Sequence, residues 1–535
     1  MAIALLLLTV LLLCVSSMVM KALNQLWFNP RRIRSVLHKQ GIRGPRPSFP
    51  FGNVPEMQKM QSATKIASDA QQHLHHNWVP SIFPYLHKWE NEYGPKYMYS
   101  AGTNQHLYVS DANLLRELKL LNTLDLGKPT YLGRPLQPLL GDGIIRSNGQ
   151  HWANQKKIIA PEFFLNKVKG MVDLMQTSTM EIIKKWESRI LEIRQDSGVL
   201  DMRIDEDLKT LSGDIISRAC FGSSYSQGNL IFEKISLMQE ALSKPSFLFG
   251  FLNFRFLPSE NDKKIWSLRK EVDAMLLQLV RHRQAEIGRQ SGGGVPNDQK
   301  DLLQTLLESS AAANNGMHTH KTERFVLDNC RSIYFAGSET TSLAASWTLM
   351  LLSLHPEWQE RVRAEILEVC GDHAELQRCL QDMDSLRKFK MLTMVIQETL
   401  RLYSPTVLTS RQAFKNMKLG DLNVPQGINM WIATASLHRN PKNWGPNANE
   451  FKPERFANGV TEACKDPNAY VPFGFGNRLC IGQTFAMTEL TIVLSLILSK
   501  FSFSLSPNYH HSPVQKMVLV PEHGIRLFVR LVQAS

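Results

Sequence analysis

The stretch PFGFGNRLCIG, from Pro472 to Gly482, is the part of the chain that decides the fold. Gly476 and Gly482 lack a Cβ atom, so the backbone can turn sharply there and approach a flat ligand closely. Backbone N–H groups in such a turn can point at the sulfur of Cys480, and an apolar helix predicted directly after it adds the positive end of its dipole. Both effects favour a thiolate over a thiol. The stretch therefore predicts a buried cysteine that ligates a metal.

The pattern F-x-x-G-x-R-x-C-x-G resembles the haem-binding motif of the cytochrome P450 family. The residues that meet it without a departure are Phe473, Gly476, Arg478, Cys480 and Gly482. The resemblance implies haem b as the cofactor, Cys480 as the axial ligand of its iron, and Phe473 and Arg478 as further haem contacts. It also implies a mainly α fold with small β-sheets, in a single large haem domain. Taken alone, the residues also allow a buried structural cysteine between two glycines.

Upstream, the stretch AGSETTS, from Ala336 to Ser342, lies within a long helical pattern. Gly337 weakens the helix locally, and a threonine hydroxyl can bond to a carbonyl one turn earlier and bend it. The stretch resembles the family's oxygen-activating helix, which implies Glu339 and Thr340 as the catalytic pair that relays protons. Without the resemblance, a solvated acid and two structural threonines explain the stretch.

Two more motifs follow in the family's order. In QETLRLYSP, Glu398 and Arg401 are spaced to share one side of a helix. Such a pair is commonly a surface ion pair that contributes little to stability. The resemblance implies instead that Glu398 and Arg401 join Arg455 of the PERF stretch in a buried network that braces the haem loop.

The stretch HWANQKKIIAPEF, from His151 to Phe163, resembles the family's W-x-x-x-R helix, whose tryptophan and arginine contact a haem propionate. Trp152 is present, but Lys156 stands at the arginine position and lacks the planar fork of arginine, with Lys157 as an adjacent alternative. Arg411, in the strand-like SRQAF, matches another propionate-binding arginine. The resemblance therefore implies Trp152, Lys156 and Arg411 as cofactor contacts.

The N-terminal run IALLLLTVLLLCVSSMVM, from Ile3 to Met20, carries no charge and is near the lower length limit for spanning a bilayer. Positive charges follow the run and none precedes it, which favours a retained single-pass anchor over a cleaved signal peptide. We predict a membrane anchor over residues 1–20, a basic flank and Pro-rich hinge over 21–53, and the haem domain over 54–535. The haem domain then faces the cytosol at the endoplasmic reticulum membrane.

Composition narrows the class of protein further. The chain is 43% hydrophobic and 20% charged, as expected of a globular protein with a real core. Its net charge of +13 fits a membrane surface or an acidic electron donor, and we find no nucleic-acid-binding motif and expect no nucleic-acid partner. The seven cysteines are odd in number and lack C-x-x-C spacing, so we expect no disulfide framework and a reducing compartment.

Periodicity from residue 54 onward is mostly helical, with short strand-like runs and a flexible loop at residues 291–298. The clearest predicted helices are Val168–Ile193, Asp205–Phe221, Asp273–Ile287, Thr322–Leu354, Pro356–Cys370 and Thr484–Ser499. The predicted strands are Tyr97–Ser100, Leu107–Val109, Lys516–Val520 and Ile525–Leu531.

The family resemblance implies a monooxygenase that uses O2 and electrons from a separate NADPH-cytochrome P450 reductase, because the sequence shows no flavin or nicotinamide domain. Stretches such as GIRGP, HLYVSD and LHPEWQERVRAEI resemble a large plant clan, closest to the branch that oxidises gibberellins, ent-kaurane diterpenoids and pentacyclic triterpenoids. We therefore expect a small apolar polycyclic isoprenoid as substrate. Fatty acids or cytokinin-type hormones are the alternative substrates, and a non-enzymatic haem-bearing membrane scaffold is the alternative function.

Four segments are expected by family position to face the substrate. They are Gly127 to Ile145, Asn329 to Ala336, Ser404 to Ser410 and Ser512 to Gln515. The apolar side chains expected to form the pocket wall are Leu139, Ile144, Tyr334, Phe335, Val407 and Leu408.

Overall fold

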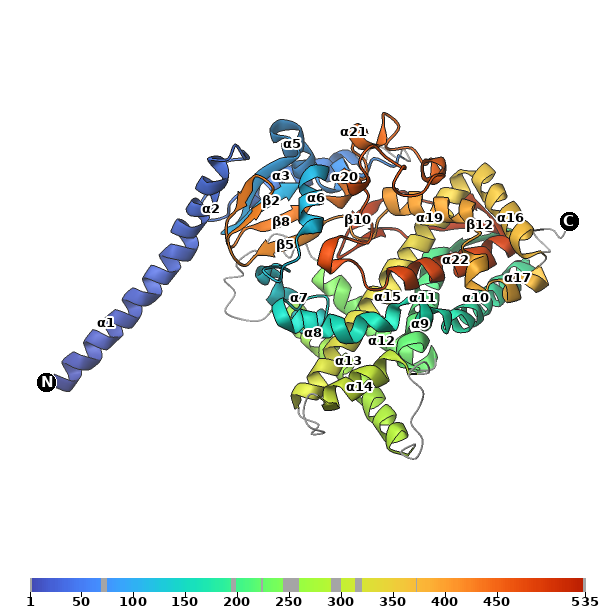
Figure 1. The fold of residues 1–535 in the computed structure, drawn as a ribbon, viewed down its shortest axis with the longest axis horizontal. Helices are drawn as coiled ribbons and strands as arrows, with labels where there is room; N and C mark the ends of the chain where they lie inside the picture. Colours follow the sequence, from blue (N-terminus) through green and yellow to red (C-terminus); the bar gives the residue numbers. More distant parts are fainter. Residues whose placement is uncertain are drawn as a thin grey trace.

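The protein is described from a computed structural model that covers residues 2–68, 75–193, 199–222, 225–243, 259–289, 300–312, 320–371 and 373–532. Helices make up most of the body and the sheets are small, as predicted (Figure 1). The five-stranded sheet lies on the side of the body from which the N-terminal helix projects, and α10, α16, α17 and α22 lie on the far side.

The helices are α1 (Ala2–Leu23), α2 (Asn29–His38), α3 (Val54–Ser68), α4 (Val79–Ile82), α5 (Pro84–Tyr93), α6 (Ala112–Leu120), α7 (Gly133–Leu140), α8 (Gly149–Ile159), α9 (Leu165–Lys169), α10 (Val172–Ile193), α11 (Ile204–Phe221), α12 (Tyr225–Leu242), α13 (Glu260–Arg289), α14 (Leu302–Ala312), α15 (His320–Leu354), α16 (Pro356–Cys370), α17 (His373–Cys379), α18 (Met383–Leu386), α19 (Lys390–Leu402), α20 (Thr434–Leu437), α21 (Pro441–Trp444) and α22 (Gln483–Lys500). The strands are β1 (Lys96–Ala101), β2 (Asn104–Val109), β3 (Leu126–Gly127), β4 (Leu200–Arg203), β5 (Thr409–Ala413), β6 (Met417–Leu419), β7 (Leu422–Val424), β8 (Asn429–Ile432), β9 (Phe501–Leu505), β10 (Pro513–Gln515), β11 (Leu519–Pro521) and β12 (Arg526–Leu531).

The sheets join segments that are far apart in the sequence. The five-stranded sheet has the order β1-β2-β8-β5-β3, in which β2 and β8 run parallel and the other neighbours run antiparallel. A second sheet has the order β4-β12-β9, and β6-β7 and β10-β11 form two-stranded ribbons. The parallel pairing places β2, the strand before α6, beside β8, the strand before α20, which fixes the N-terminal part of the domain to its C-terminal part.

Most predicted elements are confirmed, and three differ in extent. The predicted helix from Val168 is divided into α9 and α10 around Gly170, which lies outside both helices. Helix α13 begins at Glu260, well before the predicted start at Asp273. The sequence did not show this because the first turns of the helix are highly charged and obscure its apolar spacing. The strand predicted at Lys516–Val520 is confirmed only at Leu519 and Val520, which begin β11, whereas residues 516–518 form the turn between β10 and β11. The predicted loop at 291–298 lies outside the described residues.

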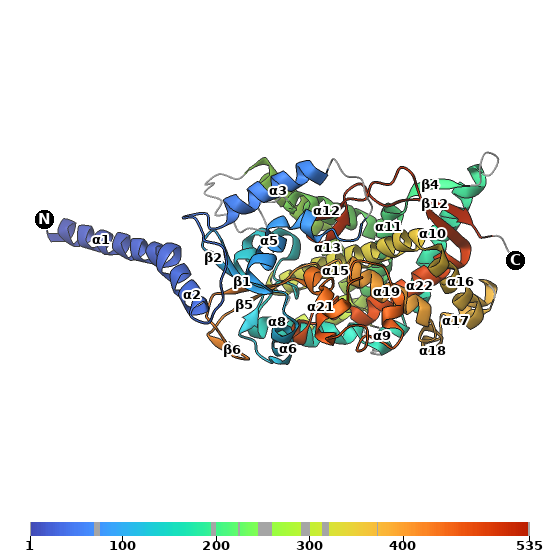
Figure 2. The same cartoon turned by 90° about the horizontal axis from the view of Figure 1, so that it is seen from above.

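Helix α15 runs through the middle of the body (Figure 2), and its central turns are buried. Helix α11 crosses it closely because position 337 is a glycine: a Cβ there would lie 2.5 Å from Cγ1 of Ile216. Gly337 therefore allows the two helices to approach each other, in addition to weakening α15 locally as the sequence suggested.

The N-terminal helix projects away from the body (Figures 1 and 2). The helical run from Leu5 to His38 contains a window of mean hydropathy 2.3 that makes no buried contact with the rest of the chain, as expected of a membrane anchor. The predicted basic flank is itself helical, since α2 continues to His38 and buries Ile33 and Leu37. The helix axis thus extends well past residue 20.

The Pro-rich segment after α2 is non-helical, as predicted, but it is bonded to the domain. The N–H of Met98 on β1 donates to the carbonyl of Arg43 at 2.9 Å. A Cβ at Gly44 would overlap the Met98 carbonyl, so the two backbones are in close contact. The segment therefore lies against the edge of the five-stranded sheet, where it connects the anchor helix to the domain.

One prediction about the cysteines is wrong. Cys370 and Cys379 form a disulfide with a Cα–Cα distance of 5.4 Å. Helix α16 ends at Gly371, whose φ of 74° reverses the chain and brings α17 back onto the end of α16. The pair has no C-x-x-C spacing, and its proximity depends on this reversal, so the cysteine count gave no indication of it.

Candidate haem site

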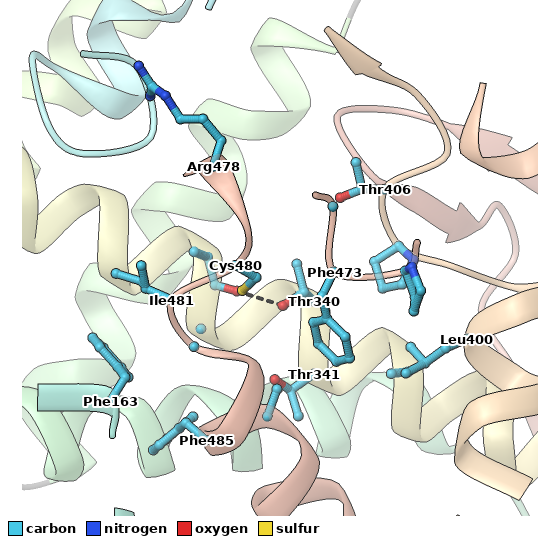
Figure 3. A pocket seen from close by; sticks show the side chains of 18 of the residues that line it. Phe163, Thr340, Thr341, Leu400, Thr406, Phe473, Arg478, Cys480, Ile481 and Phe485 are labelled. Atoms are coloured by element: carbon cyan, nitrogen blue, oxygen red, sulfur yellow. Dashed lines mark hydrogen bonds between the residues drawn. The ribbon is translucent and has the colours of Figure 1, made fainter. Parts of the chain in front are cut away.

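The loop before α22 presents the sulfur of Cys480 to an internal cavity (Figure 3). Gly474 and Gly476 have φ values of 78° and 61°, which suit glycine and allow two sharp turns. The N–H of Cys480 donates to the carbonyl of Phe473 at 2.9 Å, which closes the loop. Helix α22 begins three residues after the cysteine, close to where the sequence predicted it.

Burial raises the pKa of the Cys480 thiol, and the N–H of Gly482 opposes that rise. The loop alone therefore stabilises a thiolate less than the sequence suggested. A metal cation bound to the sulfur would supply the missing stabilisation, because coordination deprotonates a thiol. The site thus suits a metal ligand better than a free nucleophile.

One wall of the cavity is the middle of α15. Its lining residues include Ala336, Gly337, Thr340 and Thr341 (Figure 3). The Thr340 hydroxyl donates to the carbonyl of Ala336 at 2.7 Å, the backward bond that the sequence predicted. Thr340 is therefore held at the cavity with its oxygen in a fixed position.

Glu339 does not share that orientation. Its side chain is almost fully buried, and its Oε2 lies 2.8 Å from Nζ of Lys209 on α11. Lys209 is partly exposed, so the pair connects the interior of α15 with solvent. The predicted pair is thus divided between two faces of α15, with Thr340 at the cavity and Glu339 at the route to bulk water.

Three cations gather at one end of the cavity. Lys128, Arg411 and Arg478 all line it, and no aspartate or glutamate is found in its lining over the part of the chain that the structure describes. Burial lowers the pKa of Arg411 to about 10 and, together with repulsion from Arg411, lowers that of Arg478 to about 9. Burial also lowers the pKa of Lys128, with repulsion from both arginines as the second cause. Buried cations without an acid partner fit an anionic ligand, as the two propionates of haem would be.

Trp152 and Lys156 stand behind this cluster. The guanidinium of Arg478 lies 4.0 Å from the Trp152 ring centroid and donates to the Ser147 carbonyl at 2.7 Å. Lys156 donates to the carbonyl of Asn477 at 2.7 Å and is not among the cavity-lining residues. Trp152 and Lys156 therefore support the cysteine loop and Arg478, and their predicted contact with a propionate stays a prediction.

Lys128 was missed by the sequence reasoning. It lies just after β3, and its backbone is held at both ends by Asn148, which accepts its N–H at 2.7 Å and donates to its carbonyl at 3.0 Å. The family motif places a cation at position 156. Only the folded chain shows that a different lysine, Lys128, reaches the cavity. Lys128 lies within the predicted substrate-facing segment, and this was the one available signal.

We expect Lys128→Ala to weaken haem retention more than Lys156→Ala. Loss of a charge-assisted contact to a propionate is worth roughly 1.5–3 kcal/mol, so haem transfer to apomyoglobin should accelerate about tenfold or more. Lys128→Arg should retain haem, because it keeps the positive charge. Equal transfer rates for the wild type and Lys128→Ala would contradict the assignment.

The structure brings Glu398, Arg401 and Arg455 together, as the resemblance implied. Arg401 donates from Nε and Nη2 to the two carboxylate oxygens of Glu398 at 2.6 and 2.8 Å, and neither side chain is exposed. Nε of Arg455 lies 3.5 Å from Glu398. Arg401 also donates to the carbonyls of His438 and Ala448, so the network fixes the chain between β8 and the cysteine loop.

Another acid near the cavity was not singled out by the sequence. Glu489 on α22 is buried, and the Ser212 hydroxyl donates to its Oε1 at 2.7 Å. Burial raises the pKa of Glu489 to about 8, so this carboxyl is largely protonated at neutral pH. The residue stands in a long apolar run, where a single acid gives no motif.

Three of the four segments expected to face the substrate contribute to the cavity lining. They supply Lys128, then Ile333 and Ala336, and then Pro405, Thr406 and Thr409, while none of Ser512 to Gln515 is among the lining residues. None of the six apolar side chains expected in the wall is among its lining residues. Tyr334, for example, stacks on Phe221 at 4.3 Å between ring centroids. The sequence locates a helix near the pocket, but only packing decides which face of it is turned inward.

Comparisons with known proteins agree with this geometry. The profile of the family described as Cytochrome P450 matches residues 73–529. The chain therefore belongs to the cytochrome P450 family, and it is a haem-thiolate monooxygenase.

Its relatives define the branch. Cytochrome P450 714C2 of Oryza sativa subsp. japonica is 45% identical over 510 residues, covering 94% of each chain. Cytochrome P450 714A2 of Arabidopsis thaliana is 44% identical over 500 residues, covering 92% of each chain. Cytochrome P450 714B3 of Zea mays is 43% identical over 95% of this chain and 93% of its own. The chain is thus a member of the plant P450 714 family.

Proposed function

We propose that this enzyme inserts one oxygen atom from O2 into a C–H bond of an apolar polycyclic isoprenoid. The observation that carries the proposal is the part of the cavity wall that would remain for a substrate once haem is held by Cys480 and the cation cluster, namely α15 and residues 405–409. Among the described residues, this wall contributes Ile333, Ala336, Gly337, Thr340, Thr341, Ala344, Pro405, Thr406 and Thr409 to the cavity lining, so its polar side chains are all threonines. A wall of this kind recognises a large apolar skeleton by contact and orients it through few hydroxyls. The sequence resemblance to the gibberellin and triterpenoid branch favours a rigid ring system.

The residues divide the work as follows in this proposal. Cys480 would ligate the haem iron, and Phe473, which lines the same cavity, would pack against the bound haem. Lys128, Arg411 and Arg478 pair with the propionates, with Trp152 and Lys156 supporting Arg478. Bound haem supplies the activation of dioxygen, which a thiolate ligand assists.

Thr340 and Glu339 handle protons in this proposal. The Thr340 hydroxyl donates its proton to the Ala336 carbonyl, so its oxygen is a fixed hydrogen-bond acceptor at the cavity wall that can hold a proton-carrying water. Glu339 exchanges protons with water through Lys209, with which it forms an ion pair at the edge of the buried region. The remaining wall of the cavity excludes bulk water by its apolar character.

The partner and location follow from the anchor. Helix α1 has the length and hydropathy to cross a bilayer, and the basic residues that follow it favour a cytosolic position for the body. We infer a single-pass protein of the endoplasmic reticulum membrane that receives electrons from NADPH-cytochrome P450 reductase.

The direct test is to express the chain in yeast microsomes with a plant reductase and to supply gibberellins, ent-kaurenoic acid, pentacyclic triterpene acids, fatty acids and cytokinins separately. Mass spectrometry then detects NADPH-dependent gain of one oxygen. We expect a product from a polycyclic isoprenoid. Products from fatty acids or cytokinins alone would overturn the substrate proposal.

Thr340→Ala should separate oxygen consumption from product formation. The variant removes a fixed hydrogen-bond partner of the proton relay. Such a relay contributes roughly 100-fold or more, and water replaces part of that effect, so we expect about a tenfold drop in product per NADPH. Hydrogen peroxide should rise correspondingly.

The matched control is Thr348→Ala. Thr348 makes the same backward bond, to Ala344 at 2.7 Å, and is not among the cavity-lining residues. It should keep the wild-type ratio of product to NADPH. An unchanged ratio in Thr340→Ala would exclude Thr340 from the proton relay.

A further inference from the structure

One short stretch of α15 binds the backbone of the segment that covers it. The segment is residues 138–144, at the end of α7 and in the loop after it. The bonds join alternate residues of the segment to four side chains of α15. Two carbonyls accept: that of Pro138 from Arg331 at 3.0 Å and that of Leu140 from Ser332 at 3.1 Å. Two N–H groups donate: that of Asp142 to Asp328 at 2.8 Å and that of Ile144 to Asn329 at 2.9 Å. We call Asp328, Asn329, Arg331 and Ser332 the clamp.

The two residues between the last three bonds are glycines, and the contact needs them. Gly141 has a φ of 53°, and a Cβ there would overlap the Asp328 carboxylate. A Cβ at Gly143 would overlap the Ser332 hydroxyl and lie 2.5 Å from the Asp328 carbonyl. At positions 141 and 143 the segment therefore places its backbone against α15 with no side chain of its own in between.

The clamp is held rigid by buried ion pairs. Arg331 is fully buried and pairs with Asp328 and, at 3.0 Å, with Asp273 of α13. Arg324 lies 3.1 Å from each of the same two carboxylates. These pairs restrain the side chains of Asp328 and Arg331, and with the bonds to the segment they connect α7, α13 and α15.

The clamp lies next to the cavity. Ile333 follows Ser332 directly and lines the cavity, as does Ala336 one turn later. Residues 138–144 are not themselves among the cavity-lining residues. Ser332 and Ala336 lie four residues apart and share one side of α15, so the segment that Ser332 binds lies one helical turn from the cavity-lining Ala336. The bonds to the segment are made to its backbone, so they fix its position whatever its side chains are.

We propose that the clamp residues are positioning residues for substrate selection: they hold residues 138–144 against α15 and so set the width of the cavity above Ile333 and Ala336. This inference rests on the proposed function, because it makes the segment a support for the wall of the substrate site. The clamp excludes or admits bulky ligands and leaves the haem end of the cavity unchanged.

The test uses the double variant Asn329→Ala/Ser332→Ala as a haem-loaded full chain in detergent. Hydrogen–deuterium exchange at residues 138–147 should accelerate about tenfold, since the Ile144 N–H loses its acceptor. In spectral titrations, the Kd for clotrimazole, a bulky nitrogen ligand, should change about fivefold relative to the wild type. The Kd for imidazole, a small nitrogen ligand, should change less than about twofold.

Ser346→Ala is the matched control, because Ser346 is a buried hydroxyl of the same helix that bonds to its own backbone at Ser342. It should leave exchange and both affinities unchanged. If the double variant fails to load haem, Ser332→Ala alone, which removes one bond to the segment, provides the same measurements with smaller changes of the same sign.

Unchanged exchange in the segment, or equal changes in the affinities for the two ligands, would overturn the clamp proposal. The ligand measurements do not depend on the natural substrate. A clamp effect without any isoprenoid product would therefore overturn the proposed substrate alone, and an isoprenoid product without a clamp effect would overturn the clamp alone.

Discussion

Replacing Cys480 with alanine should abolish the red-shifted absorption of the reduced carbon-monoxide complex, together with all monooxygenase activity. Among the described residues, the cavity lining contains no second cysteine and no histidine, so none of these side chains can take the position of the sulfur. A thiolate is also the ligand that favours O–O cleavage, and a water or hydroxide in its place does not supply that effect. We expect the loss of activity to be complete within detection.

The matched control for this experiment is Cys464→Ala. Cys464 is half-buried, and its Sγ contacts the carbonyl of Asp466 at 3.1 Å, outside the cavity. This variant should keep the red-shifted band at wild-type intensity. Retention of the band in Cys480→Ala, or its loss in Cys464→Ala, would show that the ligand has been assigned to the wrong cysteine.

Residues of the site that belong to a contiguous motif were predictable from the sequence. Cys480, Phe473 and Arg478 share one loop, and its glycines allow the positive-φ turns that the loop needs. Glu398 and Arg401 lie three residues apart on one helix, so local geometry alone brings them together. In both cases the residues that act together lie close together in the sequence.

Residues that reach the site through packing were not predictable in the same way. Lys128 comes from a segment far from the cysteine loop in sequence, and it reaches the cavity because Asn148 holds its backbone. Glu339 faces Lys209, since the crossing of α11 over α15 decides which neighbour it meets. Tyr334 is turned toward Phe221 for the same reason. A single sequence carries no signal for such relations between distant elements.

Replacing Glu398 should destabilise the fold more than any exposed substitution. Glu398 and Arg401 are both fully buried and bonded through two parallel hydrogen bonds. Glu398→Ala leaves the Arg401 charge buried without its carboxylate partner, which costs about 3–5 kcal/mol in typical proteins. The Lys452 N–H, which donates to Glu398 at 2.8 Å, also loses its acceptor, so the chain leading to the cysteine loop loosens. We therefore expect a large fall in the midpoint of urea unfolding and poor haem incorporation during expression.

Glu454→Ala provides the contrast in the neighbouring motif. Glu454 is exposed, and its carboxylate lies 3.6 Å from Arg361, which is also exposed. A surface pair of this kind contributes at most about 1 kcal/mol, so unfolding and haem content should stay close to the wild type. If the two variants unfolded at the same urea concentration, the Glu398 network would not be what holds the cysteine loop in place. If Glu398→Ala alone lost haem while keeping its helical circular dichroism, the network would act on the loop itself, as its bonds to residues 438–452 indicate.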